Sequence, residues 1–285
     1  MRLNPFNPGS IQVSRGGGGG GFPGGGGGKL GCGGTVVVLI GVFVFGADPA
    51  QMLGVVGGMQ QSAPSEQVGG ESAEEICSVN AYATEACNAL ASLNQTWQPL
   101  FAEQGVEFRE PRLHFIVGGG VSTGCGAASS SAGPFYCPAD QTIYIDTAFY
   151  DQLDRQLGAG GDFARYYVIA HEYGHHVQTL TGVASQIRSA QQQNPRQANR
   201  LQVLMELQAD CYAGVWAGKN RNAIEPGDFE EGMTAASAIG DDALSGGRVS
   251  SESFTHGTSA QRSQALRLGI DTGDDKQCDG IVELR

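Results

Sequence analysis

Apolar positions along the chain predict one helix and two short strands ahead of a mainly helical region. Residues 85–101 repeat apolar side chains at helical spacing, which predicts a helix ending around Pro99. Residues 112–117 (RLHFIV) and 141–146 (QTIYID) are rich in β-branched and aromatic side chains, which predicts strands. Residues 121–138 between them are rich in glycine, serine and alanine, so a loop is expected there.

Two long helices are predicted further along. The first starts at Asp162, a good N-cap residue, and ends at Gly182, a residue type that commonly follows a helix. The second is opened by Pro195 and runs to about Lys219. Strands first and helices afterwards predict an α+β domain with a small sheet over a helical base. Shorter helices are expected around residues 228–239 and 259–268.

A glycine-rich tract dominates the N-terminal part. Eleven of the thirteen residues from 16 to 28 are glycine. Such a tract cannot bury enough apolar surface to offset the entropy lost on ordering. We therefore expect residues 1–29 to form a flexible tail.

An uncharged stretch follows this tail. Residues 30–47 contain no charged side chain, and eighteen residues of helix span roughly 27 Å, about the hydrocarbon thickness of a bilayer. A buried strand is the alternative, because the most apolar part, residues 36–45, is short and contains Gly41. The polar surroundings favour one transmembrane helix. Residues 48–70 then form a linker, and residues 71–285 the folded domain.

Charge predicts the orientation of this segment. Residues 1–29 carry a charge of +3, and the rest of the chain carries 14 basic and 29 acidic side chains, or −15. The positive-inside rule then predicts a single-pass membrane protein with a cytoplasmic N-terminus and an extracytoplasmic domain. A secreted protein, cleaved near Ala47 or Ala50, is the alternative. The acidic balance offers no basic patch and argues against a nucleic-acid partner.

Six of the seven cysteines follow the predicted membrane segment. An even number in an extracytoplasmic domain is compatible with up to three disulfides, and the absence of CxxC argues against a cysteine-ligated structural zinc. Cys125 and Cys137 can close a short loop, and Cys211 with Cys278 can tie a helix to the C-terminus. This pairing is one choice among fifteen connectivities.

The segment HEYGH, residues 171–175, carries the main chemical signal. On a helix its two histidines lie on one face, where both imidazoles can bind one Zn²⁺ ion. Glu206 supplies a third ligand, which leaves one position for water, and Glu172 can act as general base toward that water. A helix with two surface histidines is the alternative. Two acidic residues at the same four-residue spacing, Glu206 and Asp210, argue against this alternative.

The remaining histidines have less defined roles. His114 and His176 are expected to pack or to make polar contacts. His256, in a loop beside a glycine, can donate a hydrogen bond to the oxyanion of a tetrahedral intermediate. Competing donors for that role are the tyrosines Tyr144, Tyr173 and Tyr212. Asp241 and Asp242 are expected to form a helix-terminating turn; contact with a metal ligand, or Ca²⁺ binding, is the alternative.

These motifs resemble the gluzincin class and, more closely, a bacterial family of membrane-anchored neutral zinc metallopeptidases. The resemblance rests on CG at 125–126, GPFYCP at 133–138, IYID at 143–146, AHExGHH at 170–176, ADCYAG at 209–214, GDD at 240–242 and SFTHGTS at 253–259. It implies a zincin-like fold, with Asp210 orienting His171. It also implies that an edge strand over the motif helix binds extended substrate; those residues are Thr142, Ile143, Tyr144, Ile145 and Asp146.

The sequence therefore predicts a zinc endopeptidase that binds one ion and acts on a peptide or protein substrate. A non-enzymatic envelope or scaffold protein with a zinc-stabilised domain is the alternative. Glu172 favours the enzyme, because a purely structural site needs ligands but no adjacent base. The sequence does not indicate the natural substrate or the oligomeric state.

Overall fold

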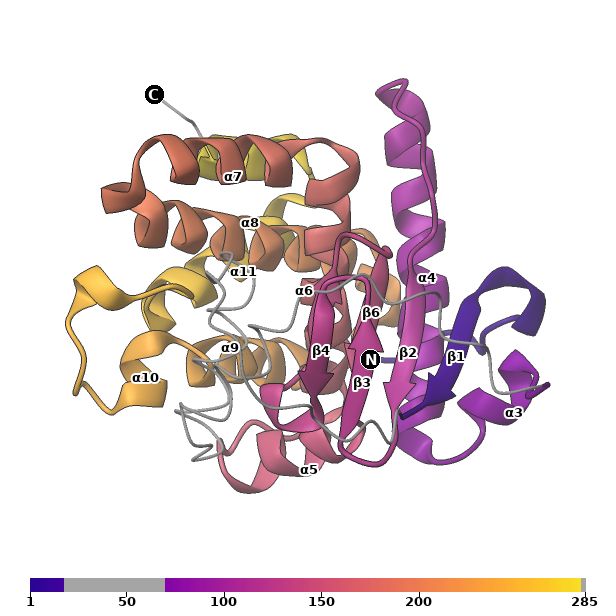
Figure 1. The fold of residues 1–285 in the computed structure, drawn as a ribbon. Coiled ribbons are helices and arrows are strands. Elements are labelled where there is room, and N and C mark those ends of the chain that lie inside the picture. The colour runs from indigo at the N-terminus through magenta and orange to yellow at the C-terminus, as the bar shows by residue number, and fades with distance from the viewer. Residues whose placement is uncertain (18–69, 283–285) are drawn as a thin grey trace.

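The computed structural model describes residues 1–17 and 70–282. It has a helical majority and two small sheets, so the expected α+β class is confirmed (Figure 1). In Figure 1 the strands lie side by side in one half of the molecule, and the helices α7, α8, α9 and α11 fill the other half. Their bounds are α7 Val183–Gln193, α8 Ala198–Lys219, α9 Asp228–Ala238 and α11 Ser259–Thr272.

The larger sheet has four strands in the order β1-β2-β6-β5. The first three run parallel, and β5 pairs antiparallel with β6 at one edge. The smaller sheet is an antiparallel hairpin of β3 and β4. The bounds are β1 Gln12–Gly16, β2 Arg112–Ile116, β3 Gly120–Thr123, β4 Gly126–Ser129, β5 Phe135–Cys137 and β6 Thr142–Ile145.

Both faces of the four-stranded sheet are covered. Leu113 of β2 and Ile143 of β6 point to one face and join the main core with the helices. Tyr144 points to the opposite face and packs with Ile116 and with Val121 of the hairpin. This alternation follows from the two-residue period of a strand, and it places the helical base against one face only.

Helix α6, Asp162–Leu180, is the centre of the helical base. It packs against α8, α9 and α4 (Ala81–Glu103), and most of its residues are buried. Gly182 follows it with a left-handed backbone at φ 81°, as expected for a residue that terminates a helix. The shorter helices are α3 Ala73–Cys77, α5 Ala148–Arg155, α10 Asp241–Ser245 and α12 Lys276–Asp279.

Helix α4 continues past the proline at which it was expected to end. Pro99 lies inside the helix, which ends at Glu103. A proline in a helix lacks the N–H for one backbone hydrogen bond. Leu100 and Phe101 beyond it are both buried, and we attribute the continuation of the helix to their packing.

The N-terminal residues belong to the folded domain. Residues 12–16 form β1, which pairs in parallel with β2, and the amino group of Met1 lies 2.8 Å from Asp228 and 3.0 Å from Asp162. The prediction of a flexible tail over residues 1–29 is therefore wrong for residues 1–17. Strand β1 was missed because the glycine-rich tract that follows it dominates the composition of this segment.

This packing bears on the predicted membrane topology. Segments before and after residues 30–47 share one sheet, so in one molecule they lie on the same side of any membrane. A single crossing that leaves residues 1–29 in the cytoplasm and residues 71–285 outside does not fit this arrangement. The predicted segment 30–47 itself, with most of the predicted linker, lies outside the described residues. Within the described part of the chain, no helix has the length and apolar character needed to span a bilayer.

Candidate metal centre

Helices α6 and α8 bring the three predicted ligands together. His171 Nε2 lies 3.2 Å from Glu206 Oε2, and His175 Nε2 lies 3.5 Å from the same oxygen. The two imidazole rings are 4.9 Å apart. All three side chains are shielded from solvent, with relative exposures of 8%, 14% and 4% for His171, His175 and Glu206.

These separations fit a single zinc ion. In a tetrahedral site with bonds of about 2.0–2.1 Å, two ligand atoms lie about 3.3 Å apart. Both histidine–glutamate distances are close to that edge length. Two imidazoles and one carboxylate are also the donor set of catalytic zinc, which leaves one coordination position open. His171, His175 and Glu206 therefore form a group that can hold a metal ion.

Each ligand histidine is oriented through its other ring nitrogen. His171 Nδ1 lies 2.8 Å from Asp210 Oδ1, one turn after Glu206 on α8, as the sequence analysis expected. His175 Nδ1 lies 2.9 Å from Gln178 Oε1, which sequence reasoning missed. Gln178 is three residues further along α6, on the same helix face. Such partners set the tautomer and the direction of the metal-binding nitrogen.

The charges of this site are strongly coupled. Burial would lower the pKa of His171, but Asp210 and Glu206 outweigh it and raise the pKa to about 9. Burial would raise the pKa of Glu206, but the facing His175 and His171 hold it well below its usual value, and His256 acts in the same direction. The carboxylates of Asp210 and Glu206 thus favour positive charge at the histidines, and the same negative charge would favour a bound cation.

Glu172 lies beside the three ligands but is not one of the metal-binding side chains. Its side chain is buried, and its carboxylate has no hydrogen bond to any other described residue. Burial raises its pKa, while the neighbouring His171 and His175 counteract part of that shift. A carboxylate with a raised pKa next to a metal site has the properties of a general base.

His256, in the loop before α11, interacts electrostatically with Glu206 of the triad. Its Nδ1 lies 3.0 Å from Asp241 Oδ1, and its Nε2 is buried without a hydrogen-bond partner in residues 1–17 and 70–282. The other oxygen of Asp241 accepts hydrogen bonds from the backbone N–H groups of Thr255, His256 and Gly257. Asp241 begins helix α10, so the predicted helix-terminating turn is wrong, and its carboxylate fixes the direction of His256.

The three competing tyrosines point elsewhere. The hydroxyl of Tyr144 donates to Asp140, on the outer face of the sheet. The hydroxyl of Tyr173 donates to Asn94 of α4, and that of Tyr212 lies 3.4 Å from Asp279 near the C-terminus. Of the four candidates, His256 is the one with a buried polar atom that has no partner among the described residues.

The other two histidines have structural contacts. His176 is fully buried, with Nε2 2.6 Å from the carbonyl oxygen of Arg109 and Nδ1 3.0 Å from the hydroxyl of Tyr136. His114 on β2 lies 2.8 Å from Ser14 Oγ and 3.1 Å from the carbonyl oxygen of Gly16. These contacts connect α6 to the sheet and β2 to β1.

The predicted substrate strand is internal. Residues Thr142 to Ile145 form β6, which has β2 on one side and β5 on the other, and Asp146 follows it. An internal strand has no free edge for a peptide, so the prediction that residues 142–146 form an edge strand is wrong. The edge strand next to α6 is β5, Phe135–Cys137. Sequence reasoning missed it, because three residues inside a predicted loop give no clear alternation.

Three disulfides join the six cysteines of residues 70–282. Cys125 is bonded to Cys137 and Cys211 to Cys278, the two pairs chosen in the sequence analysis. The third joins Cys77 to Cys87. The first attaches the hairpin to edge strand β5, and the second attaches α8, which carries Glu206, to α12.

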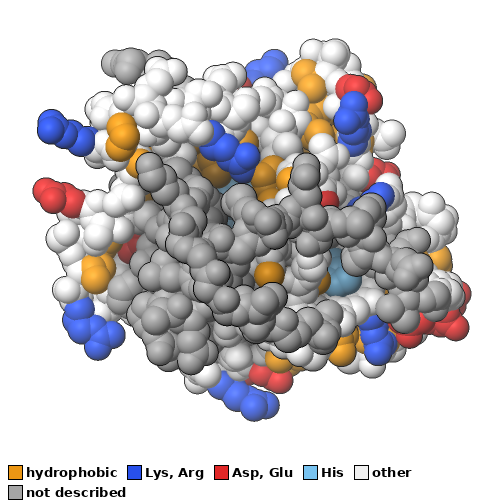
Figure 2. Space-filling view, viewed as in Figure 1, with side chains coloured by type: hydrophobic (Ala, Val, Ile, Leu, Met, Phe, Trp, Pro, Cys, Tyr) orange, Lys and Arg blue, Asp and Glu red, His pale blue; other side chains and the backbone are white. Residues whose placement is uncertain are grey.

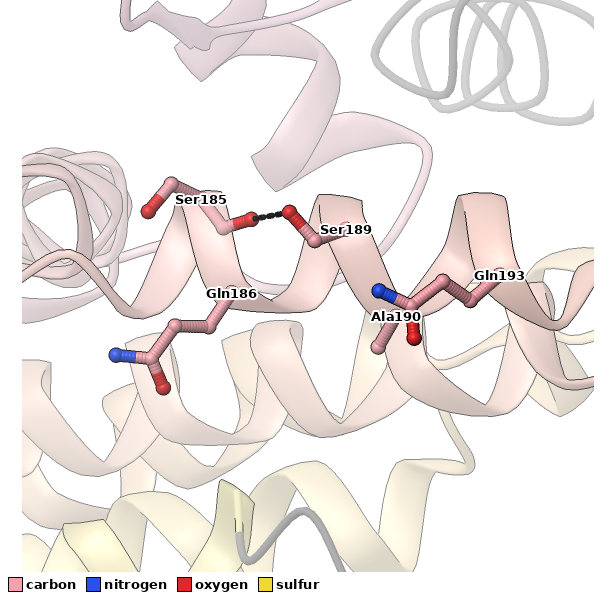
Figure 3. Close-up of a pocket in the computed structure, with 5 residues that line it drawn as sticks. All are labelled: Ser185, Gln186, Ser189, Ala190 and Gln193. Carbon is pink, nitrogen blue, oxygen red and sulfur yellow. Dashed lines mark hydrogen bonds between the residues drawn. The ribbon is translucent and has the colours of Figure 1, made fainter.

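Two surface features carry no chemistry of this kind. A hollow over α7 is lined by serine, glutamine and alanine side chains, none of them ionisable (Figure 3). On the face in Figure 2, the basic side chains of the described residues are dispersed among acidic and neutral ones. The metal-binding triad is therefore the site with the clearest chemistry.

Comparison with known proteins agrees with this geometry. The family described as "Putative neutral zinc metallopeptidase" matches residues 7–281. The chain is 46% identical over 256 residues to "Uncharacterized protein YpfJ" of Escherichia coli K12, covering 86% of this chain and 85% of the relative. It is 43% identical over 204 residues to "Uncharacterized protein Rv2575" of Mycobacterium tuberculosis H37Rv, covering 66% of this chain and 67% of the relative. No solved structure matches the chain significantly. With a family match that spans nearly its whole length and the triad that such a peptidase requires, this chain belongs to the neutral zinc metallopeptidase family.

Proposed function

We propose that this protein is a zinc-dependent endopeptidase that hydrolyses peptide bonds in peptides or proteins. The observation that carries the proposal is the position of Glu172. Glu172 is a buried residue directly beside a complete two-histidine, one-glutamate donor set, and its carboxylate has no hydrogen bond to another described residue. A purely structural zinc site has its coordination sphere closed by protein ligands and needs no such neighbour.

A zinc ion held by His171, His175 and Glu206 would supply Lewis-acid activation of a water molecule and of the substrate carbonyl. Glu172 then accepts the proton of the water and returns it to the leaving amine. Its pKa, raised by burial, brings the carboxylate closer to the working pH of a general base.

His256 is the proposed donor to the oxyanion. Its Nε2 has no partner among the described residues, and Asp241 holds the ring by Nδ1. A protonated Nε2 donates a hydrogen bond to the negative oxygen that develops on the substrate carbonyl. The substrate backbone is proposed to pair with the edge strand β5, because an extended peptide adds to a free sheet edge.

We place the domain in an oxidising compartment outside the cytoplasm. The support is the joining of six cysteines in three disulfides, since such bonds are rare in cytosolic proteins. Membrane attachment through residues 30–47 is part of this proposal, but not as a single crossing, because β1 pairs with β2 and residues 1–17 therefore lie on the same side as the domain.

Metal analysis combined with a peptide-library digest tests this function. The purified full chain should contain one zinc ion and cleave library peptides internally. A chelator should abolish cleavage, and added zinc should restore it. A zinc-loaded protein that cleaves nothing in a broad library would instead support the scaffold alternative, in which the ion only stabilises the fold.

A further inference from the structure

Arg262 is a charged residue in the interior, directly behind the metal site. It lies on α11, is 1% exposed, and is among the largest side chains that are fully buried. Burying a guanidinium without partners is very costly, so its contacts define its role. Its sequence position, 52 residues after Asp210, offered no spacing signal.

The guanidinium grips Asp210 with two hydrogen bonds. Arg262 Nε lies 2.8 Å from Asp210 Oδ2, and Nη2 lies 2.9 Å from Oδ1. Nη2 also lies 3.2 Å from the hydroxyl of Tyr167, which in turn donates to Asp210 Oδ1 over 2.6 Å. A bidentate pair of this kind fixes the plane of the carboxylate as well as its position.

The fixed carboxylate is the one that holds a zinc ligand. Asp210 Oδ1 receives His171 Nδ1 at 2.8 Å, in addition to Tyr167 and Arg262. With Oδ2 occupied by Arg262 and Oδ1 shared in this way, the carboxylate cannot rotate without losing a charge-assisted hydrogen bond. The direction of His171 Nε2 toward the metal position therefore depends on Arg262.

We propose that Arg262 is a positioning residue for the metal centre: by clamping Asp210 it fixes the orientation of His171. The main chain of contacts runs from α11 through α8 to α6, and Arg262 Nη2 also lies 3.3 Å from His171 Nδ1 itself. The inference rests on the proposed zinc site and deepens it, because it names a residue that tunes the affinity and geometry of that site without touching the ion.

A simpler role, holding α11 against α8, is already performed by other residues. The two helices touch backbone to backbone: a Cβ atom on Gly214 would lie 2.1 Å from the carbonyl oxygen of Leu266, and one on Gly269 would lie 2.0 Å from that of Cys211. The ion pair between Arg262 and Asp210 is therefore not the sole contact between these helices, and its specific effect is on the orientation of Asp210.

The test measures metal binding rather than catalysis. Arg262→Lys keeps the charge but loses the fork, because an ammonium cannot bind a carboxylate in the same bidentate geometry. We expect its zinc affinity, measured by competition with a chromophoric chelator, to fall about 10- to 100-fold, as for loss of other partners of metal ligands. The visible absorption of the cobalt-substituted protein should also change, because it reports the geometry of the ligands.

Three further variants separate positioning from folding. Arg221→Lys is the matched control, because Arg221 also binds α11, through the carbonyl oxygens of Ile270 and Asp271, but has no contact with Asp210. It should keep the parent's affinity and cobalt spectrum. The pair Asp210→Asn with Arg262→Met removes both charges together and avoids leaving one unpaired. Its affinity should be no lower than that of Asp210→Asn alone.

The outcomes are distinguishable. A folded Arg262→Lys variant with the parent's zinc affinity and cobalt spectrum would overturn the inference. The inference would also be overturned if the double variant bound zinc more weakly than Asp210→Asn alone. Arg262 would then act on the site independently of Asp210. If the parent chain binds neither zinc nor cobalt, the proposed metal site itself fails, and this inference fails with it.

Discussion

Gly174 of α6 lies directly against Ala209 of α8. A Cβ atom on Gly174 would be 2.8 Å from both the Cα and the carbonyl oxygen of Ala209, closer than atoms can approach without a shift. Gly174 precedes the ligand His175, and Ala209 precedes Asp210. This contact therefore sets the separation of the two helices that carry the metal ligands.

Gly174→Ala should weaken zinc binding although it changes no ligand. The added methyl group must push α8 away from α6, at a cost of about 1–3 kcal/mol in the free energy of unfolding. Because Glu206 moves with α8, the zinc affinity should fall as well. Gly218→Ala is the matched control, since its methyl group meets Ile270 between α8 and α11, away from the triad. Equal zinc affinity in the two variants, measured by competition titration, would contradict this explanation.

Removing any single ligand should remove most of the zinc. His171→Ala, His175→Ala and Glu206→Ala each leave two ligands of the three that fit the ion. Metal content measured by elemental analysis should fall from about one zinc ion per chain toward zero. His176→Gln is the control, because His176 is adjacent but binds Arg109 and Tyr136 instead. If Glu206→Ala retains zinc as tightly as the parent, the third ligand is another residue.

The metal site was largely predictable because its signals are local. His171 and His175 are four residues apart on one helix, as are Glu206 and Asp210, and helical periodicity brings each pair to one face. The contributions of Arg262 and Asp241 arise from packing between segments distant in the chain, and no sequence spacing reports that packing. The internal position of β6, between β2 and β5, also results from pairing between strands, which the sequence of β6 alone does not report.

The N-terminal strand shows a different limit. Residues 12–16 form a short segment that runs into the glycine tract, and they have no recognisable core pattern on their own. They become a strand because β2 offers a free edge, about one hundred residues later. Composition correctly describes the cost of ordering such a segment, but it does not report a partner that supplies the compensating hydrogen bonds.

His114 should make the stability of the domain depend on pH. Burial holds its pKa below the usual value, so the folded state binds its proton less readily than the unfolded state. The free energy of unfolding should therefore fall as the pH drops below about 6.5, the pKa of an exposed histidine. His114→Gln should show a smaller decrease between pH 7.5 and pH 5, measured by urea denaturation of the metal-free protein. Parallel pH profiles for parent and variant would argue against this origin.

His256→Gln should slow peptide cleavage and leave zinc bound. Loss of an oxyanion donor costs about 10²–10³-fold in kcat, whereas the triad remains complete. Asp241→Asn should have a smaller effect of the same kind, because the ring of His256 stays but loses its charged partner. Measurement of kcat and zinc content for both variants tests the assignment. An unchanged kcat in His256→Gln would remove His256 from the mechanism.

Glu172→Gln separates the enzyme from a metal-stabilised scaffold. Glu172 is not one of the three metal-binding side chains, so the variant should keep its zinc affinity and its thermal stability. Glutamine preserves the shape of the side chain but cannot accept the proton of the water. Cleavage of a library-derived peptide should therefore fall about 10²-fold or more. Glu103→Gln, at the exposed end of α4, makes the same chemical change away from the site and should cleave like the parent. A zinc-loaded Glu172→Gln protein that cleaves as fast as the parent would refute the assignment of the base.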